Sequence, residues 1–109
     1  MKRKKTAYIS GKITGTTDYE NRFTNAEKKL KGMRYDVVNP LRMTAHLVGK
    51  HKTMGLPSPE WSDYMKERLQ ALLLFCDTIY MLRGWEDSKG AKLEHHVAGV
   101  LGMEILEEE

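Results

Sequence analysis

A single carboxylate on an otherwise apolar helix face is the strongest chemical signal in this sequence. The spacing predicts a helix over residues 88–101, in which Ala91, Glu94, Ala98 and Leu101 share one face. The other members of this face are apolar, and a carboxylate on such a face is costly unless a partner or a reaction uses it. We therefore expect Glu94 to be a reactive group.

Other polar groups are predicted to lie near this carboxylate. Ser88 and Gly90 stand at the opening of the helix, where free backbone N–H groups can bind an anion. Asp77 begins an apolar strand, and Asp87 lies one loop away from Glu94. Carboxylates that share a pocket shift each other's pKa values, so that one acts as acid and another as nucleophile. This pattern is typical of glycosidic bond cleavage; for Asp87, capping the helix is an alternative role.

The segment 11–18 is a turn-rich loop between a strand and a helix. It is not a P-loop, because Lys12 is followed by Ile13, and the spacing of Gly11 and Gly15 does not match a dinucleotide-binding motif. A flexible loop with Lys12 and Thr14 at a helix start can bind a phosphate or sugar hydroxyls. An ordinary turn is the alternative.

Histidine and tryptophan residues give weaker signals. His95 and His96 point about 100° apart on a helix, and no Cys/His spacing matches a zinc site, so we expect neither metal nor cofactor. Trp85 lies in the loop before this helix, where its indole either stacks on a nucleobase or packs over the pocket rim. Trp61 and Tyr64 are predicted to belong to the core or to an interface.

The composition indicates one globular domain over residues 1–109. The chain is 40% hydrophobic and 30% charged, with a net charge of +3. No apolar stretch approaches membrane-spanning length, and the lone Cys76 lies in an apolar setting, so we expect a cytoplasmic protein with an inert thiol. The basic residues 2–5 and the acidic residues 107–109 are expected to be solvated, and no motif for specific nucleic-acid binding accompanies them.

Hydrophobic patterning predicts alternating strands and helices. Four strands are expected over 6–10, 35–39, 77–82 and 103–106, and three helices over 19–32, 61–76 and 88–101. The order predicts an α/β fold with parallel strands and helices on both faces. Residues 41–60 show little periodicity and are expected to form a long functional or mobile loop. The strand-to-helix loops 11–18, 40–60 and 83–88 should converge on one pocket.

These residues together resemble the nucleoside 2-deoxyribosyltransferase-like superfamily, and most closely its DUF4406 proteins. The resemblance covers nearly the whole chain and is carried by residues 8–15, 38–41, 61, 63–65, 76–82, 84–91 and 93–98. Its most specific part is the pattern Ser-x-Gly-Ala-x-x-Glu-x-x-x-Ala that begins at Ser88. The resemblance implies a flavodoxin-like three-layer sandwich with a small parallel sheet of four or five strands.

The resemblance also implies a reaction and a set of site residues. Glu94 matches a nucleophile that attacks the anomeric carbon of a 2-deoxyribosyl group, Tyr8 matches a residue that orients it, and Asp77 and Asp87 resemble acids that contact the base or assist its departure. The positions expected to bind substrate are Gly11, Lys12, Ile13, Gly15, Asn39, Trp85, Ser88 and Gly90.

The expected activity is N-glycosidic bond cleavage or base exchange on a 2′-deoxynucleoside or its 5′-monophosphate. Hydrolase and transferase differ only in whether water or a second base attacks the sugar–enzyme intermediate. The alternatives are a nucleotide-binding module without turnover and a structural protein. The partners expected are a small-molecule nucleoside or nucleotide and further copies of the chain, as a homodimer or larger homo-oligomer.

Overall fold

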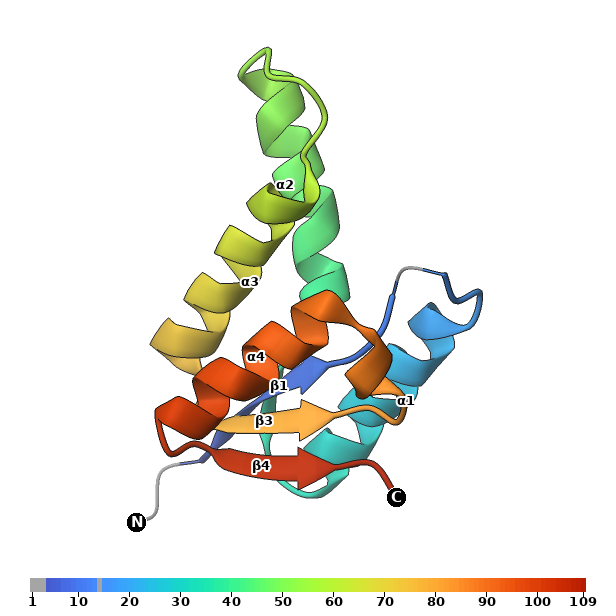
Figure 1. The fold of residues 1–109 in the computed structure, drawn as a ribbon, viewed down its shortest axis with the longest axis vertical. Coiled ribbons are helices and arrows are strands. Elements are labelled where there is room, and N and C mark those ends of the chain that lie inside the picture. The colour runs from blue at the N-terminus through green and yellow to red at the C-terminus, as the bar shows by residue number, and fades with distance from the viewer. Residues whose placement is uncertain (1–3, 14) are drawn as a thin grey trace.

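Four parallel strands form the central sheet in the computed structural model, which describes residues 4–13 and 15–109 (Figure 1). The strands are β1 (Thr6–Ser10), β2 (Asp36–Val38), β3 (Thr78–Met81) and β4 (Glu104–Glu107), in the spatial order β2-β1-β3-β4. The expectations for Thr14 and for the first three residues of the chain fall outside the described residues.

Helices cover both faces of this sheet. In β1, Ala7 and Ile9 pack with Phe23 of α1 (Tyr19–Gly32), while Tyr8 between them belongs to the cluster on the other face. That second cluster contains Leu72 of α3 (Trp61–Phe75) and Ala98 of α4 (Lys89–Val100). In the order β2-β1-β3-β4, the connection from β1 to β2 runs toward one side of the sheet, and the connection from β3 to β4 runs toward the opposite side. Right-handed crossovers therefore place α1 and α4 on opposite faces. The predicted α/β flavodoxin-like sandwich is confirmed.

The predicted loop over 41–60 is wrong, because residues 40–53 form a helix, α2 (Pro40–Thr53). Pro40 stands in the first helical turn, and the Asn39 side chain caps the helix by accepting a hydrogen bond from the Leu41 N–H at 3.0 Å. Within the predicted loop, only residues 54–60 lack helix or strand.

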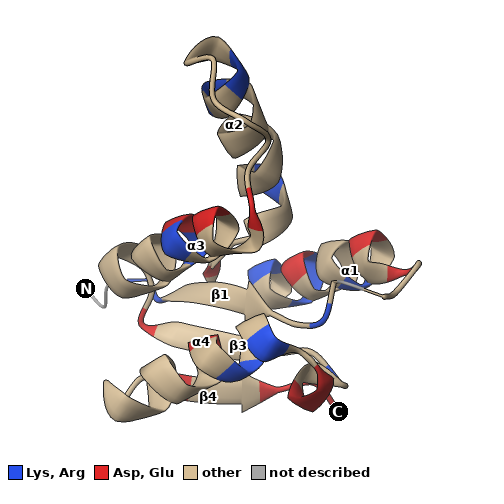
Figure 2. Cartoon of the chain, turned by 45° about the horizontal axis from the view of Figure 1, so that its top comes forward, with Lys and Arg blue, Asp and Glu red and all other residues tan. Residues whose placement is uncertain are grey.

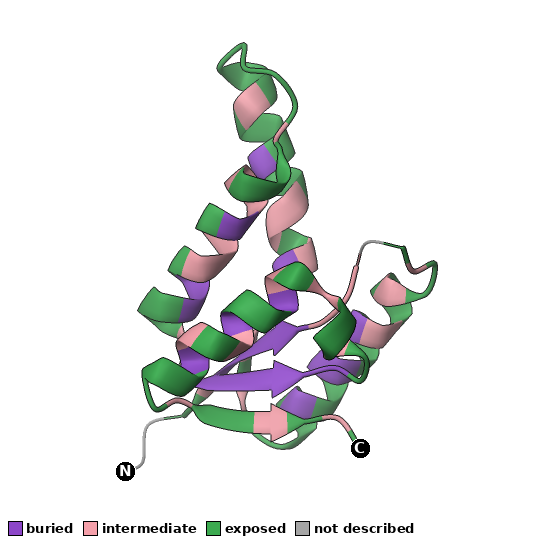
Figure 3. Cartoon of the chain, viewed as in Figure 1, coloured by how far each residue is buried: buried purple, intermediate pink, exposed green. Residues whose placement is uncertain are grey.

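The weak hydrophobic periodicity of α2 follows from where the helix lies. Together with the first turns of α3 it projects beyond the sheet, so that most of its surface is exposed (Figure 3). Only Pro40 and Leu47 are buried, and its charged residues are all Lys or Arg (Figure 2). A helix that packs on one neighbour needs few apolar positions, and the repeat is too sparse to recognise.

One residue predicted on a buried helix face is exposed. Leu101 follows the last residue of α4, where the chain leaves the helical path, and it is 56% exposed. The other predicted members of this face, Ala91, Glu94 and Ala98, are buried. Cys76 is half-buried, and burial followed by the nearby charge of Asp77 raises the pKa of its thiol to about 12, so it stays protonated. No helix in the described part of the chain is long and apolar enough to cross a membrane.

A buried carboxylate joins α1 to the start of α2. Glu27 is 6% exposed, and its oxygens accept hydrogen bonds from Asn39 Nδ2 at 3.0 Å and from Arg42 Nη2 at 2.8 Å. Lys31 Nζ lies 3.0 Å from the same carboxylate. Because Asn39 also caps α2, Glu27 connects α1 to the start of this helix.

Replacing Glu27 by Gln should lower the free energy of unfolding at pH 7 by on the order of 1–2 kcal/mol. The hydrogen bond from Arg42 is the main cause that lowers the pKa of Glu27 from 4.5 to about 2. The ionised carboxylate therefore contributes stability that is fully present above pH 4.5 and is lost as the pH falls toward 2. The magnitude is reduced because the partner charges of Arg42 and Lys31 are exposed and screened.

Urea unfolding of the wild type and the Glu27→Gln variant, from pH 7 down to about pH 2, measures this contribution. Glu20→Gln is the control, since it removes the same charge from an exposed position on the same helix. Equal losses in the two variants, or a loss that does not change with pH, would contradict the proposed role of Glu27.

Candidate active site

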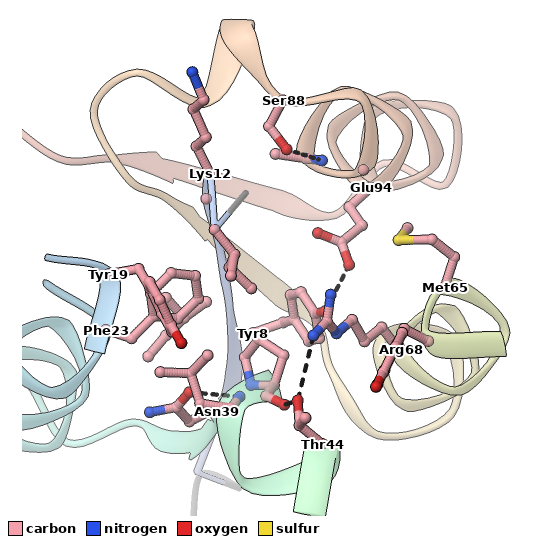
Figure 4. A pocket seen from close by; sticks show the side chains of 18 of the residues that line it. Tyr8, Lys12, Tyr19, Phe23, Asn39, Thr44, Met65, Arg68, Ser88 and Glu94 are labelled. Atoms are coloured by element: carbon pink, nitrogen blue, oxygen red, sulfur yellow. Dashed lines mark hydrogen bonds between the residues drawn. The ribbon is translucent and has the colours of Figure 1, made fainter. Parts of the chain in front are cut away.

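One cavity of about 960 Å³ lies where the loop after β1, the start of α2 and the loop before α4 meet (Figure 4). Its walls come from five segments of the chain, which contribute residues within 8–13, 19–24, 39–45, 61–68 and 87–94. Tyr8 and Ile9 lie in β1. The other lining residues lie in loops that follow strands or belong to α1, α2, α3 and α4. The three predicted strand-to-helix segments thus converge at the carboxyl ends of the strands, where an open α/β sheet binds its ligands.

Glu94 is buried in the wall of this cavity, with 4% of its surface exposed. Tyr8 donates a hydrogen bond from its hydroxyl to Glu94 Oε2 at 2.5 Å, and Ser10 donates one from Oγ to Glu94 Oε1 at 2.7 Å. Both oxygens of the carboxylate are therefore held by β1. Ser10 was not among the predicted site residues, although residues two apart in a strand point to the same face, which places it beside Tyr8.

The protonation of this pair is set by burial. Burial raises the pKa of Glu94, while the hydrogen bonds from Tyr8 and Ser10 and the positive charge of Arg68 act in the opposite direction. Burial, and then the neighbouring Glu94 charge, raise the pKa of Tyr8 well above its ordinary value. Tyr8 therefore remains a hydroxyl donor, and Glu94 is a carboxylate whose basicity is higher than that of an exposed one.

The first turn of α4 forms one wall of the cavity through residues 88–91. Ser88 caps the helix by accepting a hydrogen bond from the Ala91 N–H at 3.1 Å. A Cβ on Gly90 would lie 3.0 Å from Met65 Sδ, so the missing side chain lets α4 pack closely against α3. The Lys89 ammonium lies 4.4 Å from the centre of the Trp61 ring. A helix start with exposed N–H groups and a cation can bind an anionic group.

The loop after β1 forms another wall. Gly11, Lys12 and Ile13 line the cavity. A Cβ on Gly11 would lie 2.7 Å from Leu82 Cδ1, so glycine is required for the chain to pass the end of β3. Gly15 has a φ of +80° and does not line the cavity; its predicted substrate contact is not seen.

Asn39 and Asp87 line the cavity in different ways. The Asn39 side chain is buried and bonded to Glu27 and to the start of α2, so it shapes the wall. Asp87 is exposed at the end of the short 3₁₀ helix η1 (Trp85–Asp87). The alternative that Asp87 caps the next helix is wrong, because Ser88 does so.

Asp77 does not belong to this site. It is an exposed residue before the first position of β3, where its Oδ1 accepts hydrogen bonds from the Thr6 N–H at 2.9 Å and the Thr78 hydroxyl at 3.3 Å. In a parallel sheet all strands begin on one side and end on the opposite side. Asp77 precedes its strand, so the structure does not bring it together with Glu94 at the cavity.

Trp85 also lies away from the cavity wall. Its ring stacks on His95 of α4 with the ring centres 4.2 Å apart, and its Nε1 donates a hydrogen bond to Glu107 Oε1 at 3.3 Å. Of the two roles considered for Trp85, stacking on a nucleobase and packing over the pocket rim, the structure shows packing of the ring, against α4. Trp85 and Asp87 are two residues apart in η1, and because a 3₁₀ helix has three residues per turn, their side chains point in different directions.

The α3 wall contains residues whose role sequence analysis did not foresee. Trp61 and Tyr64, expected in the core or an interface, line the cavity, and Trp61 is 44% exposed. Arg68 also lines it, with Nη2 3.4 Å from the Thr44 hydroxyl of α2 and its guanidinium 5.5 Å from the centre of the Tyr64 ring. Nothing in the one-dimensional pattern distinguishes this arginine from a solvated charge at the edge of an apolar helix face.

Comparison with known families places this chain beside proteins of one described family. Residues 5–107 match the family described as "Domain of unknown function (DUF4406)". The curated proteins contain no match to this sequence. Within the described ranges 4–13 and 15–109, no group of three His, Cys, Asp or Glu side chains is placed to hold a metal ion.

The raised pKa of Glu94 predicts a stability difference between the wild type and a Glu94→Gln variant that grows as the pH rises. Because burial makes the folded pKa higher than the unfolded value of 4.5, the folded state binds the proton more tightly. Wild-type stability is therefore lost as the pH rises from 4.5 through the folded pKa, and the neutral Gln side chain removes this loss. Each pH unit between the two pKa values corresponds to about 1.4 kcal/mol.

Urea unfolding of both proteins between about pH 4 and pH 8 provides the measurement. Tyr8→Phe is the matched variant: it removes a hydrogen bond that lowers the pKa of Glu94, and should extend the pH range over which stability falls. A difference between wild type and Glu94→Gln that does not change with pH would show that burial does not raise the pKa of Glu94.

Proposed function

Since the chain belongs to the DUF4406 family, whose description names no activity, we propose its function from the site itself: cleavage of the N-glycosidic bond of a 2′-deoxynucleoside or its 5′-monophosphate. The observation that carries this proposal is the buried Glu94 carboxylate, held through both oxygens in the wall of a cavity by Tyr8 and Ser10. Such a carboxylate is oriented, partly desolvated and more basic than usual, as a nucleophile requires.

In the proposed reaction, Glu94 attacks the anomeric carbon of the deoxyribose. A bond forms between the carboxylate oxygen and C1′, the C1′–N bond breaks, and its electron pair leaves with the base. Asp87, the second carboxyl group that lines the cavity beside α4, is the proposed proton donor to the departing base. Water, or the ring nitrogen of a second base, then attacks C1′ and gives its proton to the Asp87 carboxylate, while the bond between C1′ and Glu94 breaks and releases the free Glu94 carboxylate.

The rest of the cavity supports a nucleotide as substrate. Its volume of about 960 Å³ lies within the range of small-molecule sites. Ser88, Lys89 and Gly90 at the start of α4, together with Lys12 of the loop after β1, provide the kind of environment that binds a phosphate. We therefore assign the 5′ end of the substrate to this wall.

A nucleotide-binding module without turnover is the second candidate. One observation favours it: Asp87, the proposed proton donor, is exposed, whereas general acids are usually partly buried so that their pKa is raised. Under this alternative the cavity binds the nucleotide, and the Glu94 carboxylate orients a hydroxyl of the sugar.

The enzyme hypothesis predicts that the wild-type protein releases free base from at least one 2′-deoxynucleoside or 5′-monophosphate. Glu94→Ala should reduce the rate by on the order of 10³-fold or more, because it removes the group that forms the covalent bond. Chromatography of a substrate panel measures base release. Mass spectrometry of the quenched reaction should find a deoxyribosyl group on the peptide that contains Glu94.

Glu86→Gln is the control, since Glu86 is an exposed glutamate of η1 that does not line the cavity. Its rate should equal that of the wild type. Nucleotide binding by wild type and Glu94→Ala without base release or exchange from any substrate would favour the binding module. Equal rates for wild type and Glu94→Ala would exclude Glu94 as the nucleophile.

A further inference from the structure

Arg68 of α3 is a positively charged residue that lines the same cavity as Glu94 of α4. It extends from α3 into the cavity wall between Thr44 and Met65, on the side of the cavity where Tyr8 and Glu94 meet (Figure 4). The hydrogen bond to the Thr44 hydroxyl and the contact of its guanidinium with the Tyr64 ring hold it in this position. The side chain thus has a fixed location instead of a free, solvated one.

The charge of Arg68 is not neutralised by a carboxylate contact. None of the ion pairs formed among residues 4–13 and 15–109 includes this arginine. A half-buried guanidinium usually has a carboxylate partner, because its desolvation must be compensated. The buried carboxylate on the facing helix is Glu94, and the positive charge of Arg68 acts on both Glu94 and Tyr8.

The other charged groups around the cavity are differently engaged. They are Lys12, Glu20, Arg42, Asp87 and Lys89. Arg42 is paired with Glu27, the Lys89 ammonium lies over the Trp61 ring, and the Lys12 side chain extends away from Glu94 (Figure 4). Glu20 and Asp87 are exposed and carry negative charge, which would oppose the ionisation of a nearby carboxylate. Arg68 is therefore the cation placed to offset the burial of Glu94.

We propose that Arg68 is a positioning residue whose charge keeps the buried Glu94 carboxylate ionised in the free protein. Burial alone favours the neutral acid, which cannot attack a sugar carbon. The two hydroxyl donors of β1 and the guanidinium of α3 together oppose this effect, and the arginine contributes the only full positive charge among them. The inference rests on the proposed function for its catalytic meaning, but the ionisation of Glu94 can be measured without a substrate.

The test is a pH titration of the Glu94 side-chain carboxyl carbon by ¹³C NMR, in protein labelled at glutamate. The Glu94→Gln variant identifies the resonance by its loss. Arg68→Gln should raise the titration midpoint of Glu94 above that of the wild type, whereas Arg68→Lys, which retains the charge, should restore most of the difference. Circular dichroism of each variant establishes that the fold is intact.

Two further variants separate charge from structure. Lys66→Gln removes an exposed positive charge from the same helix and should leave the midpoint unchanged. Thr44→Val removes the hydrogen bond to Arg68 without changing any charge, and should shift the midpoint less than Arg68→Gln does. An Arg68→Gln midpoint equal to that of Lys66→Gln would overturn the proposal.

The titration also separates this inference from the proposed function. If base release is found, the acid limb of its pH–rate profile should move to higher pH in Arg68→Gln, in step with the NMR midpoint. A midpoint that moves as expected in a protein that releases no base would support the role of Arg68 and reject the enzyme. An acid limb that moves while the NMR midpoint stays constant would reject the role of Arg68.

Discussion

The site depends on one constraint: a carboxylate that is removed from water must be compensated by its neighbours. Glu94 lies on the face of the sheet that α3 and α4 cover with apolar residues. Its two oxygens accept hydrogen bonds from hydroxyl groups of a single strand, β1. Tyr8 is fully buried and reaches Glu94 from below, and Ser10 is almost fully buried beside it. These two donors can act together only because β1 is a central strand, whose register is set by β2 on one side and β3 on the other.

The same packing that buries the carboxylate also creates the space above it. Gly11 allows the chain to pass close to Leu82, and Gly90 allows α4 to approach Met65, so two glycines bring the walls together. The third wall is formed by α2, whose start is held by the Asn39 cap and by the buried Glu27 below it. The cavity is thus bounded by elements that are each fixed by a polar or steric contact of their own. This rigidity suits a site in which groups must stay aligned with a substrate.

Several features of this molecule were predictable because they arise from contacts close in sequence. The helix that carries Glu94 and the burial of the face shared with Ala91 and Ala98 follow from helical spacing. The strands are short apolar runs, and their alternation with helices was enough to predict a parallel sheet with helices on both faces. The helix over 40–53 was missed because it packs on little more than one neighbour and has few buried positions.

By itself the sequence determined the local elements, the unusual carboxylate at position 94 and the region where strand ends should form a pocket. Tertiary structure alone decided which charged and aromatic groups reach that pocket. Asp77 does not reach the pocket because it precedes β3, at the opposite end of the strand from the pocket. Trp85 does not reach it because its ring packs on His95. Arg68 and Ser10 are included because α3 and β1 bring them beside Glu94 from 26 and 84 residues away in the chain. Contacts across such separations depend on how whole elements pack, which no local pattern of residues encodes.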